Sequence, residues 1–313
     1  MKLSSRIASI DIGTNTVLML IADVNSHGMI TTVHEEQRII RLGKNVDAEK
    51  NIGTEGLEKC ADVLREYKTI ADKFSCDQLT ACGTSALRDA SNREWFCDEI
   101  KKQTGISIEI ISGDEEALWT FQGGRLVLSE PELVQSEILV IDIGGGSTEF
   151  IQGNSSTIHH KISLDIGAVR LTEKFIHSDP ISSVEEKTLT QFAADLMKEK
   201  LSNFRSGEKV QAIGVAGTIT TLAAMEQRME KYQPEKINGY TITKNSLQKL
   251  LEELRPTTLA QRKSLKGLQP ERADVILAGA FILSEAMSYF NLNELTVSNH
   301  GLRYGLVLRL IKN

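Results

Sequence analysis

Two short segments with the same order of residue types stand far apart in the chain. Residues 7–16 read IASIDIGTNT, and residues 138–148 read ILVIDIGGGST. In each, an apolar run leads into Asp-Ile-Gly and then small or hydroxylated residues, before a second apolar run begins. This order predicts a strand, a tight turn and a returning strand. Asp11 and Asp142 are 131 residues apart, too far for a solenoid repeat. We therefore expect two similar domains, each with one such turn.

The second of these turns has the composition of a phosphate-binding loop. Three successive glycines allow backbone N–H groups to approach one ligand without obstruction by Cβ atoms, and Ser147 and Thr148 add hydroxyl donors. Asp142 stands just before the turn, where a carboxylate can hold a Mg²⁺ ion that also binds phosphate. For a lone turn of this kind, an empty hairpin is the favoured interpretation. Its counterpart 131 residues earlier favours a phosphate clamp built from both turns.

Two further segments supply charges. The sequence SGDEEA, residues 112–117, places three carboxylates at an expected helix start, where the helix dipole favours them and one could orient a water molecule. Taken alone, the cluster is better explained as an ordinary helix start, although three adjacent carboxylates exceed what a helix start requires. The segment GTSALRDASN brings Arg88 just past a short strand, which suits bidentate phosphate binding. Pairing with Asp89 or Glu94 at the surface is the alternative.

The segment GVAGTITTL, residues 214–222, predicts a strand, a turn of small residues and a helix start. Gly217 and Thr218 would place free N–H groups at that helix end, a natural nucleotide or anion loop. A close helix–strand contact that needs small residues is the alternative. Arg272, in the segment PERAD, is a further basic candidate for binding an extended anion.

Other chemistries are excluded or left aside. No Walker lysine follows either Asp-Ile-Gly turn, and no GxGxxG with a ribose-binding acid is present. In the segment SNHGLRYG, His300 has no partner acid or nucleophile nearby in the sequence, so it is left out of the mechanism. No serine–histidine pair is visible, so no phosphoenzyme is expected.

The elements that must position these residues alternate between strands and helices, which predicts an α/β architecture. Expected helices span residues 54–74, 92–103, 114–123, 167–177, 183–204, 218–231 and 301–311, with a mostly helical stretch over 244–290. Besides the strands flanking the first turn, strands are expected at residues 79–83, 106–111, 137–143, 148–152, 159–164, 210–214 and 294–297. The predicted domains are residues 1–128 plus 304–313, and residues 129–303, with the boundary in the polar connection 127–136.

The amino-acid composition argues against several classes of binding partner. With 36 basic and 42 acidic residues the formal charge is −6, which argues against DNA, RNA or an anionic membrane surface as partner. No apolar stretch reaches the roughly 18–20 residues of a membrane span. Four cysteines match no zinc pattern, so a cytoplasmic protein with reduced thiols is expected. Because the whole chain is negatively charged, any attraction for a polyanion must come from basic groups close to the binding site.

Taken in order, these segments resemble the exopolyphosphatase/guanosine pentaphosphate phosphohydrolase (Ppx/GppA) family, in its short two-domain form, over residues 7–310. The resemblance implies membership of the superfamily of acetate and sugar kinases, Hsp70 and actin. Two ribonuclease-H-like domains with an interdomain cleft would follow. It also implies release of the terminal phosphate of polyphosphate, or of the 5′-γ-phosphate of pppGpp, with Mg²⁺ or Mn²⁺.

The resemblance assigns roles to individual residues. Glu116 matches the catalytic residue that positions or deprotonates the attacking water. Glu149 matches a second active-site carboxylate, and Asp11, Asp142 and Glu149 would serve the metal. Phosphate contacts are implied for Thr14, Asn15, Arg88, Gly144, Gly145, Gly146, Ser147 and Thr148.

Some questions stay open at this stage. Longer family members continue into further helical domains, one of them of HD type. Because this chain stops at residue 313, short polyphosphates are the expected substrates. The sequence does not decide between polyphosphate and pppGpp, and it leaves a homodimer open. An acceptor-dependent kinase of the same superfamily and a non-catalytic, nucleotide-binding relative of actin are the alternatives, although the latter gives the SGDEEA cluster no role.

Overall fold

The computed structural model describes residues 4–43, 50–129, 137–155, 157–205 and 210–312. The chain divides into two compact units, Met1–Gly123 with Leu302–Asn313 (the first unit) and Gly124–Gly301 (the second unit). Most of the expected boundary, residues 127–136, falls at 130–136, outside the described residues. The domain limits given above therefore stay a prediction.

The first unit is built on a mixed five-stranded sheet in the order β3-β2-β1-β4-β5. Central strand β1 is antiparallel to β2 and parallel to β4, and β2 is antiparallel to β3. The strands are β1 (Ser4–Ile12), β2 (Thr16–Asn25), β3 (Ile30–Ile39), β4 (Gln78–Gly83) and β5 (Glu109–Ile110).

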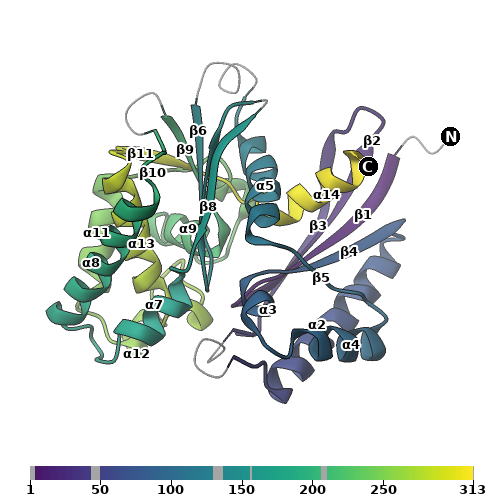
Figure 1. Cartoon of the computed structure of the whole chain (residues 1–313), viewed down its shortest axis with the longest axis horizontal. Helices are drawn as coiled ribbons and strands as arrows, with labels where there is room; N and C mark the ends of the chain where they lie inside the picture. Colours follow the sequence, from purple (N-terminus) through teal and green to yellow (C-terminus); the bar gives the residue numbers. More distant parts are fainter. Residues whose placement is uncertain (1–3, 44–49, 130–136, 156, 206–209, 313) are drawn as a thin grey trace. The chain divides into compact units, whose positions relative to one another are not determined.

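Helices cover both faces of this sheet, as Figure 1 shows. They are α2 (Thr54–Lys73), α3 (Ser85–Asp89), α4 (Arg93–Thr104), α5 (Gly113–Gly124) and α14 (Leu302–Lys312). Side chains alternate along β1, so Ile10 packs in one core with α2 and α4, whereas Ile7 packs with Tyr304 and Val307 of α14 in another. The first unit thus contains both ends of the described chain.

The second unit repeats the arrangement around β6. This strand is antiparallel to β7 and parallel to β9, and the sheet runs β10-β11-β9-β6-β7-β8. Its strands are β6 (Glu137–Ile143), β7 (Thr148–Gly153), β8 (Ile158–Leu164), β9 (Val210–Val215), β10 (Thr241–Thr243) and β11 (Glu294–Val297). Apart from the edge strand β10, both sheets have the same strand order and directions. The sequence repeat is therefore a structural one, and the predicted α/β fold class is confirmed.

The helices of the second unit surround a large apolar core to which α13 contributes most of its length. They are α7 (Ala168–Phe175), α8 (Ser183–Lys200), α9 (Ala216–Glu226), α10 (Pro234–Ile237), α11 (Lys244–Leu254), α12 (Leu259–Arg262) and α13 (Ile276–Tyr289), with short 3₁₀ turns η1 (Arg125–Val127) and η2 (Pro270–Arg272). None of the helices in the described residues is long and apolar enough to cross a membrane.

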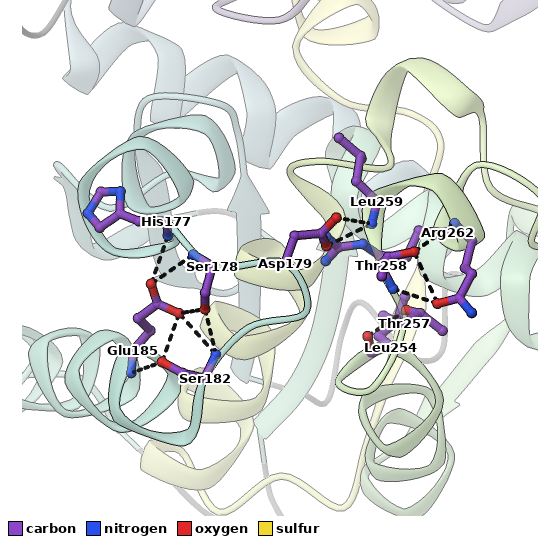
Figure 2. Close-up of polar contacts among 11 residues, drawn as sticks. His177, Ser178, Asp179, Ser182, Glu185, Leu254, Thr257, Thr258, Leu259 and Arg262 are labelled. Carbon is purple, nitrogen blue, oxygen red and sulfur yellow. Dashed lines mark hydrogen bonds and ion pairs between the residues drawn. The ribbon is translucent and has the colours of Figure 1, made fainter.

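The connection between α7 and α8 is fixed by two carboxylates (Figure 2). Glu185 accepts hydrogen bonds from the backbone N–H groups of His177, Ser178 and Ser182, and it completes a capping box with Ser182 at the start of α8. Asp179 accepts the N–H of Leu259 at 2.8 Å, which ties the same connection to α12.

Several elements differ from expectation. The expected strand over 106–111 forms only Glu109–Ile110, and β3 and β10 were not expected at all. Strand β3, with the sequence ITTVHEEQRI, lies at a sheet edge and is mostly half-buried. It therefore lacks the apolar alternation from which a strand is recognised.

Candidate active-site residues in the two units

In the second turn, residues 144–147 between β6 and β7, the backbone carbonyl oxygens and the backbone N–H groups differ in their hydrogen bonding. It is closed by a 3.0 Å hydrogen bond from the Gly144 N–H to the Ser147 carbonyl. The carbonyl oxygens of Gly144 and Gly145 accept hydrogen bonds of 2.9 to 3.1 Å from the first N–H groups of α7. Among the described residues, the N–H groups of Gly145, Gly146 and Ser147 donate to no acceptor. The turn therefore offers donors and little acceptor capacity, which favours an anion.

Two residues missed by sequence reasoning bring α7 against this turn. A Cβ atom on Gly167 would lie 2.2 Å from the Gly145 carbonyl oxygen, so only glycine permits the contact. Arg170 donates from Nε to the Gly146 carbonyl at 2.7 Å. A signal was present, because Asp165, Ile166 and Gly167 repeat the Asp-Ile-Gly pattern directly after an expected strand.

Asp142 and Glu149 stand opposite each other in the β6–β7 pairing, at the base of the second turn. Opposite residues of an antiparallel pair share one face of the sheet, so the structure brings these two carboxylates together. Both are buried, and Glu149 accepts a 2.6 Å hydrogen bond from Ser163 of β8. The hydroxyl of Thr148, expected to contact phosphate, donates instead to the Ile166 carbonyl.

The structure also brings Gly217 and Arg272 together. A Cβ atom on Gly217 would lie 2.3 Å from Nη1 of Arg272, so the guanidinium packs directly on the start of α9. The neighbouring Thr218 is buried. Burial lowers the pKa of Arg272 to about 10. A small residue is thus needed at position 217. The close contact that requires it is with the side chain of Arg272, and not with a strand as the alternative interpretation held.

The first turn, residues 13–15 between β1 and β2, is built in the same way. A 3.0 Å hydrogen bond from the Gly13 N–H closes it. The Thr14 carbonyl accepts from Gly43 at 2.8 Å, and the Asn15 carbonyl accepts from the N–H groups of residues 40 and 41 at 3.0 Å. A Cβ on Gly43 would lie 2.2 Å from the Thr14 side chain. Each turn is therefore backed by a segment that occupies its carbonyl oxygens and includes a glycine at the point of closest approach.

Side chains around the first turn connect it to α3. The hydroxyls of Thr14 and Ser85 are 2.8 Å apart and buried, and Asn15 is buried beside them. Asp11 lies one residue before the end of β1. Because Ser85 begins α3 and Arg88 lies one turn later, the same short helix reaches both the first turn and the acidic cluster.

The two glutamates of the acidic cluster make different contacts. Glu115 accepts hydrogen bonds from the hydroxyl and backbone N–H of Ser112, as a residue at a helix start does. Glu116 is buried and accepts a hydrogen bond from Nη1 of Arg88, which also reaches the Ile111 carbonyl at 3.2 Å. Burial raises the pKa of Glu116, and the charge of Arg88 opposes that rise.

Two residues of the segment SNHGLRYG make contacts near the start of α14. Arg303 forms a 2.7 Å ion pair with Glu35, and both side chains are largely buried. The backbone N–H of His300 donates to the hydroxyl of Ser298 at 3.1 Å.

In the described parts of the chain, no group of three or more histidine, cysteine, aspartate or glutamate side chains is placed to hold a metal ion. Magnesium is commonly held by one or two carboxylates together with substrate phosphates, and not by a complete protein cage. The hard oxygen donors of Asp142 and Glu149, paired at the base of the second turn, fit that pattern.

Comparison with known proteins identifies the family. Residues 20–313 match the Ppx/GppA phosphatase family. The chain belongs to this family. The family and the fold class expected from the sequence are therefore confirmed, with the two-domain, actin-like fold of solved Ppx/GppA structures.

Similar family members vary in length. The chain is 33% identical over 318 residues to exopolyphosphatase 2 of Mycobacterium tuberculosis, covering 98% of each. It is 36% identical over 314 residues to a bifunctional 3-dehydroquinate synthase/phosphatase of Fusobacterium nucleatum, covering 98% of this chain but 46% of that protein. The chain thus spans about half the length of that relative.

Solved structures of the family are similar over nearly the whole chain. The Aquifex aeolicus PPX-GPPA enzyme superposes with a TM-score of 0.82 at 32% identity, covering 98% of this chain and 99% of that one. An exopolyphosphatase from Cytophaga hutchinsonii superposes with a TM-score of 0.89 at 30% identity, covering 98% of both.

Proposed function

We propose that this protein hydrolyses the terminal phosphoanhydride bond of inorganic polyphosphate and releases orthophosphate. The observation that carries the proposal is the second turn, whose carbonyl oxygens are occupied by α7 while the N–H groups of Gly145, Gly146 and Ser147 have no acceptor among the described residues. The family membership and the match to exopolyphosphatase 2 over 98% of both chains support polyphosphate as the anion.

The terminal phosphate would be bound by the two turns and by Arg88. Thr14 and Asn15 would contribute from the first turn, and residues 144–147 from the second, since the Thr148 hydroxyl is bonded to the Ile166 carbonyl. Phosphoryl transfer depends on positioning and on neutralising charge more than on covalent catalysis, and turns rich in N–H donors supply both. The guanidinium of Arg88 adds a fork that matches two phosphate oxygens.

Glu116 would activate the attacking water. The water oxygen attacks the terminal phosphorus in line, the bridging P–O bond breaks, and the water proton passes to the Glu116 carboxylate. The shortened chain leaves with the bridging oxygen. Burial, which raises the pKa of Glu116, makes the carboxylate a better proton acceptor at neutral pH.

Mg²⁺ or Mn²⁺ would be held by Asp142 and Glu149 and by Asp11. The ion, when bound, would offset the negative charge of the phosphate oxygens.

Short polyphosphates are the proposed substrates, and the 5′-γ-phosphate of pppGpp would fit the same turns. Gly217, Thr218 and Arg272 would contact phosphates further from the cleaved bond, or a nucleotide. The formal charge of −6 gives no long-range attraction for a polyanion, so only these local groups would hold the substrate.

The experiment is a phosphate-release assay on short polyphosphate, long polyphosphate, pppGpp and ATP, without any acceptor. Release from polyphosphate by the wild-type protein, lost in a folded Glu116→Gln variant, is the expected result. Release only after addition of a hydroxyl acceptor would mean a kinase and would contradict the proposal. Equal release by the wild type and the folded variant would contradict the role proposed for Glu116.

A further inference from the structure

We propose that Arg170 is a positioning residue for phosphate binding, because its side chain fixes the direction of the last N–H group of the second turn. This inference rests on the proposed function, in which that turn binds the terminal phosphate. It concerns a residue that contacts the turn through its carbonyl side and does not itself take part in the chemistry.

The argument begins with the planarity of the peptide bond. In a trans peptide, the C=O of one residue and the N–H of the next belong to one plane and point in opposite directions. The carbonyl of Gly144 therefore sets the direction of the Gly145 N–H. In the same way, the Gly145 carbonyl sets the direction of the Gly146 N–H, and the Gly146 carbonyl sets the direction of the Ser147 N–H.

All three of these carbonyls are held on the α7 side. The Ala168 N–H donates to Gly144 at 2.9 Å, and the N–H groups of Val169 and Arg170 donate to Gly145 at 2.9 and 3.1 Å. The third carbonyl, on Gly146, is held by the side chain of Arg170 at 2.7 Å. Three successive N–H groups are consequently directed away from α7, toward the side where an anion would be bound.

These anchors are needed because the turn consists of glycines. Glycine accesses more of backbone conformational space than other residues, so a Gly-Gly-Gly segment without anchors can rotate its peptide planes at little cost. A rotated plane would present a carbonyl oxygen to the phosphate and repel it. The first two planes are held by the backbone of a helix, whereas the third depends on one side chain.

The side chain of Arg170 suits this task. Its exposed fraction is 17%, and its Nη2 atom lies 3.9 Å from a carboxylate oxygen of Asp165, whose side chain is 85% exposed. An ion pair of that length to an exposed carboxylate contributes little. The bond to Gly146 is short and charge-assisted, and it lies beside the Ser147 N–H, so the arginine also adds positive charge near the turn.

The test compares Arg170→Gln and Arg170→Lys with the wild type. The matched control is Arg205→Gln, which removes an arginine that is 72% exposed and lies near Glu137, at the opposite end of β6. We expect Arg170→Gln to raise KM for polyphosphate and the inhibition constant of inorganic phosphate by about 10- to 100-fold, because the binding group is misplaced and not removed. The kcat should fall by a smaller factor than KM rises, since the Ser147 N–H would bind a phosphate oxygen in the ground state as well as in the transition state.

Two further measurements separate positioning from a general loss of structure. Arg170→Lys keeps a charged donor, so its KM should lie between those of the wild type and Arg170→Gln. In glycine-labelled wild-type protein, inorganic phosphate should shift the amide resonances of Gly145 and Gly146, and the shifts should require about tenfold more phosphate in Arg170→Gln. Thermal unfolding of all variants shows whether they are folded.

The inference is overturned if Arg170→Gln binds inorganic phosphate as the wild type does. It is also overturned if its KM rises only in step with a loss of folded protein, or no more than in Arg205→Gln. A wild-type protein that releases no phosphate from polyphosphate would overturn the proposed function instead. The inorganic-phosphate titration would still test Arg170 in that case.

Discussion

Arg88 donates a hydrogen bond to the Glu116 carboxylate, although the two residues belong to different helices of the first unit. Their side chains are 20% and 10% exposed. We propose phosphate binding for the first and water activation for the second, so an incoming phosphate competes with Glu116 for the guanidinium. Substrate binding is then expected to release the carboxylate when a water molecule requires it.

Replacing Glu116 tests its proposed role directly. Glu116→Gln keeps the shape of the side chain and removes its basicity, so kcat should fall by about 10²- to 10⁴-fold. The control is Glu115→Gln, which alters the neighbouring carboxylate that binds Ser112 and should leave kcat within a few-fold of wild type. Phosphate release and thermal unfolding are measured for both. Comparable kcat values for the two variants would refute the assignment.

The dependence of the rate on pH tests the competition for Arg88. Because burial raises the pKa of Glu116, the acidic limb of kcat/KM should lie above the ordinary glutamate value of about 4.3. When phosphate draws Arg88 away, the carboxylate loses the charge that opposes the rise, so its pKa rises further. The acidic limb of kcat should therefore lie at higher pH than that of kcat/KM. Acidic limbs at the same pH would show that Arg88 stays on Glu116 in the complex and would contradict the competition.

The metal requirement is tested by titration. We expect phosphate release to stop in excess chelator and to return with Mg²⁺ or Mn²⁺. Asp142→Asn should raise the metal concentration needed for half-maximal activity, because it weakens one of the oxygen donors at the base of the second turn. Full activity in chelator would rule out a divalent ion in the reaction.

The network in Figure 2 predicts how stability depends on pH. The Ser178 hydroxyl and then the backbone N–H groups of Ser182 and His177 hold the pKa of Glu185 far below its ordinary value. Its stabilising contribution is present above the unfolded-state pKa of about 4.3 and is lost as pH falls through the folded-state pKa. Glu185→Gln should have a lower Tm than wild type at pH 7, with a smaller difference in acid. Glu199→Gln, on the same helix, is the control, and an equal effect would contradict this account.

Chain length is tested with the product ladder from long polyphosphate. Only a few basic groups, Arg88 and Arg272 among them, are proposed to hold the substrate, so phosphates beyond them add no binding energy. We expect the whole population of chains to shorten gradually on a gel. Full-length chains that persist beside free phosphate, without intermediates, would indicate a long binding track and processive action.

Both turns could be predicted from the sequence because each is formed by a contiguous segment. The recurrence of the same order of residue types also predicted that the two units would be similar. Arg88 and Glu116 were each singled out, but 28 residues separate them, and no sequence pattern states that two side chains point at each other. Arg170 was missed for the same reason. Its importance depends on the direction of one helix start relative to a turn that is 24 residues away.

The last helix has a consequence for biosynthesis. Ile7 and Leu20 are covered by Tyr304 and Val307 of α14, so one face of the first sheet lacks its cover until residues 302–312 leave the ribosome. The second unit, encoded entirely within residues 124–301, meets no such delay. Domains commonly fold in the order of their synthesis. In this protein the unit that begins first on the ribosome is completed last, after the nascent chain has supplied every strand of its neighbour.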